Sequence, residues 1–242
     1  MKSDSSPFNA RWIASHIVGG PQTSAPAPYL KRDFTLEAPL ERATLRITAL
    51  GLYECHLNGR RVGRDVLAPG WTDYRKRVAF QQHDVTALLQ SGANRIGVIL
   101  GDGWYCGFMN ECPRQLNGDR PELLAELSLL FKDGPHRIIG SDAEWESRLE
   151  SADWDQPGGS PGGWLPVEVR ADKAIEIHPS AAPPIREQEQ LPARLLETRK
   201  DRRIYDMGQN FSGVVRLRVT APAGRHLTLR HGEMLRPDGT VY

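Results

Sequence analysis

The sequence predicts an all-β protein, and three features support that prediction. Apolar and polar residues alternate along many short segments; Leu45, Ile47 and Ala49 alternate with Arg46 and Thr48. Alternation with a period of two is typical of a strand with one buried face and one solvated face. The 18 prolines and 23 glycines among 242 residues favour short strands over long helices. Turn sequences separate the alternating segments at short intervals.

The N-terminal part is predicted to contain two strands. We expect disorder in residues 1–9 and either a first edge strand or an anchoring segment at residues 11–13. Residues 19–28 form a loop that proline and glycine keep extended. Residues 29–36 form a strand, which Pro39 closes.

A hairpin is predicted around Asn58-Gly59. Tyr53, Cys55 and Leu57 alternate with polar residues directly before it. A type I′ turn needs a positive φ at both central residues, and Asn-Gly adopts this conformation at low cost. The turn should therefore fix the register of the two strands.

Further strands are predicted at residues 78–83 and 96–100, with a helical turn capped by Asp84 at residues 85–89. Residues 123–131 fit a helix or a strand by periodicity. We favour a strand, because a Lys-Asp-Gly turn follows it and leads into residues 137–139.

The C-terminal part is predicted to begin a second β-sandwich after a Pro- and Ala-rich connection at residues 178–189. Val215, Leu217 and Val219 should pair with Leu227 and Leu229 in a hairpin. Three or four strands cannot cover both inner faces of a sandwich. We therefore expect this unit to lean on the first, to self-associate or to fluctuate.

Several blocks in a fixed order resemble one family. They are GLYECHLNGRRVG, VLAPGWTDYRKRV, HDVTALL, GANRIGVILGDGWY, YDMGQNFSGVVRLRV, LRHGEML and PDGTVY. Together they resemble the N-terminal region of bacterial α-L-rhamnosidases of glycoside hydrolase family 78. Residues 145–164 depart from that family, which usually has a longer passage ending near a Tyr-Asp-Ala-Arg block.

The resemblance implies a galactose-binding-like jelly-roll β-sandwich at residues 10–175, of the carbohydrate-binding kind. It implies part of a concanavalin-like β-sandwich at residues 185–242. In the family, the catalytic acids lie on a later (α/α)6 barrel, so no catalytic residue is carried over to this chain. The implied role is to bind rhamnosyl glycosides or to support that barrel. The alternatives are a stand-alone lectin-like module and a truncated fragment with a structural role.

A candidate sugar site lies after residue 101. Asp102 would accept hydrogen bonds from sugar hydroxyls, and Trp104 or Tyr105 would stack on the apolar face of the ring. Residues 106–122 form a long loop beside it that includes Asn110. In the structural interpretation, which we favour, the neighbouring glycines allow a tight strand end and Trp104 fills the core.

Trp71 is a second aromatic candidate for the sugar site. It precedes Asp73 and Arg75, whose spacing suits a local ion pair. We favour a structural interpretation, in which Trp71 plugs the end of the sandwich. A structural turn is likewise favoured for residues 208–213.

The sequence contains no zinc motif, because its seven histidines are scattered. The resemblance allows calcium, and the oxygen ligands would be Asp102, Asn110, Glu111, Asn117 and Asp119. We favour a solvated loop over such a site. The three cysteines are predicted to be free thiols.

Composition argues against nucleic acid and membrane partners. The formal net charge is +1, from 31 basic and 30 acidic residues. The first residues hold no apolar run and no stretch is long enough to span a membrane, so a cytoplasmic location is expected.

Overall fold

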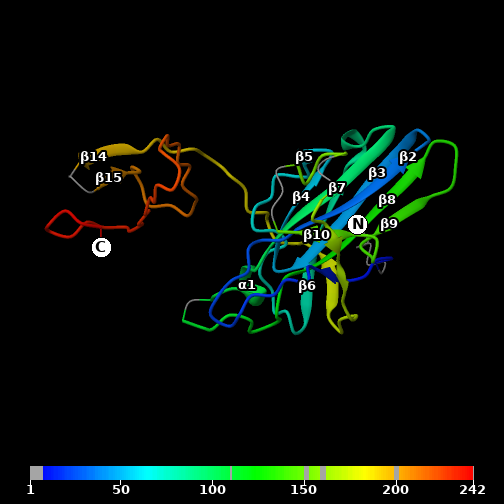
Figure 1. Ribbon diagram of the computed structural model, residues 1–242, viewed down its shortest axis with the longest axis horizontal. Coiled ribbons are helices and arrows are strands. Elements are labelled where there is room, and N and C mark those ends of the chain that lie inside the picture. Colours follow the sequence, from blue (N-terminus) through cyan, green and yellow to red (C-terminus); the bar gives the residue numbers. More distant parts are fainter. Residues whose placement is uncertain (1–7, 110, 150–152, 159–161, 199–201, 242) are drawn as a thin grey trace. The chain divides into compact units, whose positions relative to one another are not determined.

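The computed structural model describes residues 8–109, 111–149, 153–158, 162–198 and 202–241 (Figure 1). The chain divides into two compact units, residues 1–186 and residues 187–242. The three cysteines are free thiols, as predicted.

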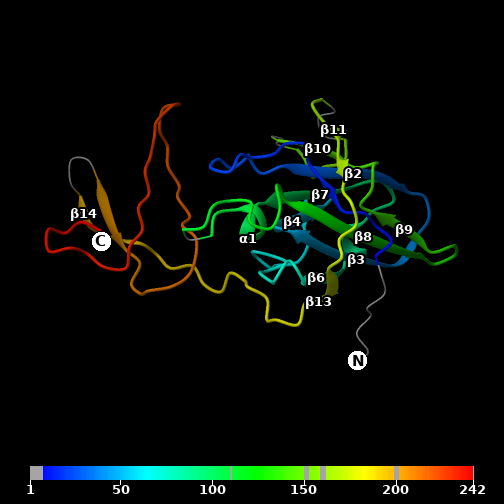
Figure 2. The ribbon, with the colours of Figure 1, turned by 90° about the horizontal axis from the view of Figure 1, so that it is seen from below.

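The first unit contains a seven-stranded sheet and a six-stranded sheet, which lie as two layers in Figure 2. The larger sheet has the order β12-β1-β8-β3-β6-β13, with β9 paired to β8. Its strands are β1 (Ile13–Ala14), β3 (Leu40–Leu50), β6 (Arg77–Asp84), β8 (Glu122–Phe131), β9 (Arg137–Gly140), β12 (Glu168–Val169) and β13 (Glu176–Pro179).

The smaller sheet has the order β11-β10-β2-β7-β4-β5. Its strands are β2 (Tyr29–Leu36), β4 (Leu52–Leu57), β5 (Arg60–Arg61), β7 (Gly92–Gly101), β10 (Glu146–Arg148) and β11 (Leu165–Pro166). The helices of the described residues are α1 (Gly103–Cys106) and the 3-10 turn η1 (Thr86–Leu88). The prediction of an all-β sandwich is therefore confirmed. None of the described helices has the length and apolar character needed to cross a membrane.

The core lies between the two sheets. Leu45 and Ile47 of β3 and Leu127 of β8 are buried on one side, and Leu30 of β2 and Ile96 of β7 on the other. Burial of each such side chain stabilises the fold by roughly 1.5–3 kcal/mol. The alternation read from the sequence therefore identified the inner faces correctly.

The predicted hairpin is present. Asn58 and Gly59 have φ values of 52° and 78°, and β4 pairs with β5 on either side of them. The Asn58 amide also donates to Asn94 Oδ1 at 2.8 Å, and its oxygen accepts from the Arg95 N–H at 2.9 Å. The turn is thus bonded to β7 as well as closing its own hairpin.

One other prediction of local structure is confirmed and a second only in part. Residues 122–131 are the strand β8, whose turn leads into β9 with Leu127 opposite Ile139. The helical turn predicted at residues 85–89 is the shorter 3-10 turn η1, whose N-cap is Val85 rather than Asp84. Asp84 Oδ1 accepts the backbone N–H of Thr86 at 3.0 Å and its hydroxyl at 2.7 Å, just before that turn.

The prediction that one face of β3 is solvated is wrong, because Arg46 and Thr48 on that face are buried. Thr48 is fully buried and donates to the Ala79 carbonyl oxygen at 2.6 Å. Arg46 is buried against Glu126, and its guanidinium carbon lies 4.5 Å from the centre of the Phe8 ring. The N-terminal segment covers this face, so polar residues are buried there in paired form.

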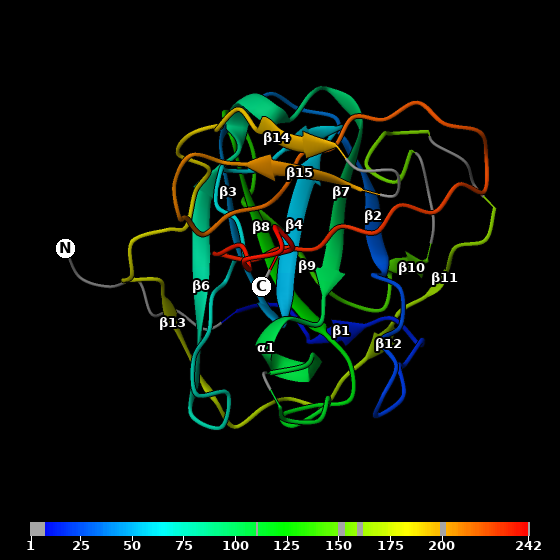
Figure 3. The same ribbon diagram turned by 90° about the vertical axis from the view of Figure 1, so that its left-hand side faces the viewer.

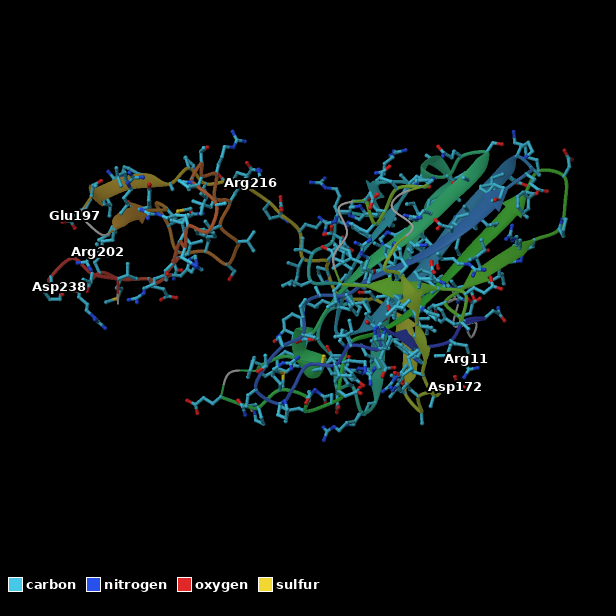
Figure 4. All side chains as sticks on the ribbon, viewed as in Figure 1. Arg11, Asp172, Glu197, Arg202, Arg216 and Asp238 are labelled. Carbon is cyan, nitrogen blue, oxygen red and sulfur yellow. The ribbon has the colours of Figure 1, made fainter. Side chains whose placement is uncertain are left out.

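The position of one strand and the start of the connection also differ from the sequence prediction. The first strand, β1, is not an edge strand, because it lies between β8 and β12. Residues 178–179, predicted as connection, belong to β13, which pairs in parallel with β6. Arg11 and Asp172, neighbours in Figure 4, form an exposed ion pair at 3.3 Å between the segments that flank β1 and β12.

The second unit contains one antiparallel pair within its described residues, β14 (Arg194–Thr198) and β15 (Arg203–Asp206). The hairpin predicted within residues 214–230 is not formed. Its apolar side chains are exposed, with 45 % of Val215 and 54 % of Leu229 accessible. The described part of the unit offers them no second layer, so alternation alone does not produce a strand there.

Hydrogen exchange should separate the two units. We predict that the amides of residues 214–219 exchange much faster than those of residues 96–100, because β7 is paired on both sides by β2 and β4. Exchange followed by mass spectrometry measures both segments in one sample. Equal, strong protection of both segments in a monomer would contradict this prediction.

Candidate functional site

A group of loops and one short helix lies at one end of the first unit. Figure 3 shows α1 across the ends of β4 and β7. Hydrogen bonds and ring contacts join residues 102–121 to residues 15–28 and 63–76. These three segments are called the α1 loop cluster below.

A buried ion pair fixes the α1 loop cluster. The Arg114 side chain is 1 % exposed, and its guanidinium donates to the Asp102 carboxylate. It also donates to the carbonyl oxygens of Gly20 at 2.7 Å and Thr23 at 2.8 Å. A buried charge is tolerated only when it is paired and hydrogen-bonded. Asp102, predicted to contact sugar hydroxyls, is therefore engaged in holding the loops together.

Tyr105 belongs to the packing beneath the α1 loop cluster. It is 6 % exposed and meets Tyr74 edge-on, with ring centres 5.2 Å apart. Gly118 approaches its ring so closely that a Cβ there would lie 2.2 Å from it. Burial raises the pKa of Tyr105 and raises that of Tyr74 to about 12. The structure thus leaves no open face of Tyr105 for a ligand to stack on.

Trp71 and Trp104 form the exposed aromatic surface. Their rings are nearly parallel, at 9°, with centres 6.0 Å apart. Trp71 is 63 % exposed, so the prediction that it plugs the sandwich is wrong. Trp104 is half-buried against the core cluster below. The pair presents ring surface to solvent on a packed base.

The loop that carries Trp71 is tightly bonded. Arg75 Nε donates to Asp73 Oδ1 at 2.9 Å and its Nη2 donates to Oδ2 at 3.1 Å, which confirms the predicted ion pair. Thr72 donates to the Arg77 carbonyl oxygen at 2.7 Å. The hydrogen bonds from Arg75 lower the pKa of Asp73 to about 2.

One exposed aromatic residue was missed by the sequence reasoning. Phe108 is 53 % exposed, and the Arg114 guanidinium carbon lies 5.8 Å from its ring centre. The sequence signal that could have identified Phe108 is its place as the single aromatic residue of the loop at residues 106–122. Asn110 lies outside the described residues.

The calcium ligands considered above do not fit a calcium site. Asp102 is paired with Arg114, Asp119 with Arg120 and Arg170, and the Asn117 amide donates to the Trp104 carbonyl oxygen at 3.4 Å. No group of three histidine, cysteine or acidic side chains among the described residues is arranged to hold a metal. Arginine already neutralises Asp102 and Asp119, two of the three carboxylates in that ligand set.

Two family models match this chain. Residues 38–152 match the alpha-L-rhamnosidase N-terminal domain, and residues 196–242 match the bacterial alpha-L-rhamnosidase concanavalin-like domain. The chain matches the N-terminal part of α-L-rhamnosidases. This confirms the resemblance seen in the sequence.

Individual rhamnosidases agree with this assignment. An alpha-L-rhamnosidase of Streptomyces avermitilis is 40% identical over 99% of this chain and 26% of its own length. A crystal structure of the rhamnosidase from that organism, complexed with L-rhamnose, covers 91% of this chain with a TM-score of 0.83 and 39% identity, over 23% of its own chain. The rhamnosidase of Aspergillus terreus covers 84% at 32% identity and a TM-score of 0.77, over 26% of its own chain. The present chain thus spans about a quarter of the length of these rhamnosidases.

We predict that Asp102→Asn destabilises the first unit by about 3 kcal/mol, because it leaves the Arg114 charge buried without a counter-ion. Glu111→Gln, a change of the same kind at an exposed position of the same loop, is the control and should change stability by less than about 0.5 kcal/mol. Urea unfolding of both variants measures the difference. Equal stabilities would show that the pair does not fix the loops.

We predict that the Asp73 carboxyl titrates with a pKa of about 2, and that Arg75→Gln raises this pKa toward its ordinary value of 3.8. NMR of the side-chain carboxyl carbon against pH measures it. Asp84, whose pKa is lowered mainly by the hydroxyl of Thr86, is the internal control and should not respond. An unchanged Asp73 in the variant would rule out the arginine as the cause.

Proposed function

We propose that this chain forms the carbohydrate-binding N-terminal part of an α-L-rhamnosidase and binds a rhamnosyl glycoside at the α1 loop cluster. The observation that supports this is the pair of parallel rings at the end of the sandwich, the exposed Trp71 and the half-buried Trp104. Aromatic side chains that remain exposed on a packed base are typical of ligand sites.

The pair suits a ring with one apolar face. A deoxysugar such as rhamnose has C–H groups and a methyl group that can lie on an indole, while its hydroxyls face water or backbone groups. In this proposal, Asp102 and Arg114 do not touch the sugar. Their role is to fix α1, so that Trp104 is held beside Trp71 before the ligand arrives.

We propose further that this part of the enzyme does not perform the hydrolysis. Glycoside hydrolysis requires two carboxyl groups, one to donate a proton and one to activate water or attack the sugar. Asp73 and Asp102 are the carboxylates nearest in sequence to the two tryptophans, and each is paired with an arginine. Neither is placed as a free acid or nucleophile, so the catalytic groups would come from another part of the polypeptide.

A binding titration tests the proposal. We predict that 4-nitrophenyl α-L-rhamnoside binds the chain with one site in the α1 loop cluster, and that Trp71→Ala and Trp104→Ala each weaken binding about 5- to 10-fold, as expected for the loss of one aromatic contact. Isothermal titration calorimetry measures the affinities. Leu130→Ala is the control, because Leu130 is an exposed apolar residue on β8.

The outcomes separate the competing roles. Binding that both tryptophan variants weaken supports a carbohydrate-binding role. Loss of the fold in Trp104→Ala, with Trp71→Ala binding normally, would assign Trp104 to the core and remove this site. Absence of binding by the native chain would favour a purely supporting role.

A further inference from the structure

The outer face of the six-stranded sheet contains a gap in its row of side chains. Lys31 of β2, Gly97 of β7 and His56 of β4 are directly opposite one another in the ladder. Side chains at these three positions share one face of the sheet. Because the middle residue is glycine, the row has a slot between its two flanking side chains.

The indole of Trp154 fills this slot from outside. A Cβ at Gly97 would lie 2.8 Å from the indole ring, so only glycine allows the approach. The ring centre is 4.7 Å from that of His56 and 5.3 Å from that of Tyr29. Trp154 is 8 % exposed, yet it belongs to neither of the two hydrophobic core clusters. It is a buried aromatic side chain held against a polar sheet face.

Polar contacts, rather than a strand, hold the segment that carries this indole. The Gly59 N–H donates to the Asp155 carbonyl oxygen at 2.8 Å, and Arg95 Nη1 donates to the Asp153 carbonyl oxygen at 3.3 Å. His56 Nδ1 lies 2.7 Å from Asp155 Oδ2, and its Nε2 lies 2.9 Å from Glu54 Oε1. Both ring nitrogens of His56 therefore face carboxylate oxygens.

We propose that this slot is a second ligand site of the first unit, for a flat aromatic ring, and that residues 153–156 close it as a strap latched by His56. An aromatic ring is the chemistry the slot accepts, because an indole fills it here between Tyr29 and His56. A free aromatic molecule and the aromatic part of an aryl glycoside would both present such a ring. The site is separate from the α1 loop cluster and does not depend on the function proposed above.

The charged groups around the slot favour a ring with polar substituents at its edge. Lys31 Nζ lies 3.0 Å from Asp33 and 2.6 Å from Glu146, and Arg61 Nη2 lies 3.2 Å from Glu54. The ion pairs of Lys31 lie on the β2 side of the slot, and the Arg61–Glu54 pair lies on the β4 side. A ligand that displaces the indole would meet apolar ring contacts in the middle and hydrogen-bonding groups at its rim.

The first experiment opens the slot in the full chain. Trp154→Ala should create an indole-sized gap above Gly97, and indole should raise the melting temperature of this variant by more than it raises that of the native chain, where Trp154 competes for the slot. Trp164→Ala is the matched control, because Trp164 is equally buried and lies against Lys31 on the same sheet. If indole stabilises neither variant, or both equally, the slot is not a ring site.

The second experiment tests the latch in a Trp71→Ala background, which weakens the first site about 5- to 10-fold. Asp155→Asn should raise the exchange rate of the Gly59 amide at least tenfold and tighten the binding of indole by a similar factor. Asp133→Asn, an exposed acid in the β8–β9 turn, is the control. Faster exchange without tighter binding would make the strap purely structural, and no change in either would exclude the His56–Asp155 contact as the latch.

The same background distinguishes the sources of the ring. Binding of both indole and 4-nitrophenyl α-L-rhamnoside, without binding of L-rhamnose, supports an aromatic site that accepts aryl glycosides. Binding of indole alone restricts the site to free aromatic molecules. Binding of L-rhamnose alone would overturn the assignment to aromatic rings.

Discussion

Every apolar face of a sheet needs a second layer, and this requirement governs the architecture of the chain. In the first unit, this requirement is satisfied at two places, where a second layer covers a sheet face. The inner faces of the two sheets cover one another, and the N-terminal segment covers the outer face of β3. In the described part of the second unit it is met only around β14 and β15, where Ile204 is buried. The alternating residues that follow form no strand and remain accessible.

Three buried arginines attach the segments that pack outside the sandwich. Arg46 pairs with Glu126, which also accepts the N–H of Asn9 in the N-terminal segment. Arg95 pairs with Asp33 and holds the strap. Arg114 gathers the loops of the candidate site. Each guanidinium can donate to several oxygens at fixed angles, which suits it to join segments distant in sequence.

Local chemistry explains why much of the fold could be predicted. Positive φ at Asn58-Gly59, alternation along β3 and the hydrogen bond from Thr86 to Asp84 are properties of neighbouring residues. The sequence predictions were wrong where the burial or pairing of a residue depends on segments distant in sequence. Burial of Thr48 depends on what covers β3, and β13 forms because β6 offers it a free edge. For the candidate site, residue type identified the aromatic residues Trp71 and Trp104. It could not reveal that Asp102 would be engaged by an arginine twelve residues away.

The ends of the two sheets in the first unit have a consequence for solubility. The terminal strands are all short: β5 has two residues, β11 two, β12 two and β13 four. β5 consists of two arginines, while β11 and β13 each end in a proline, which has no N–H to donate. A strand from another molecule would find few backbone groups to pair with and would meet charge at β5. Sheets bounded in this way resist edge-to-edge aggregation while the inner strands stay long and apolar.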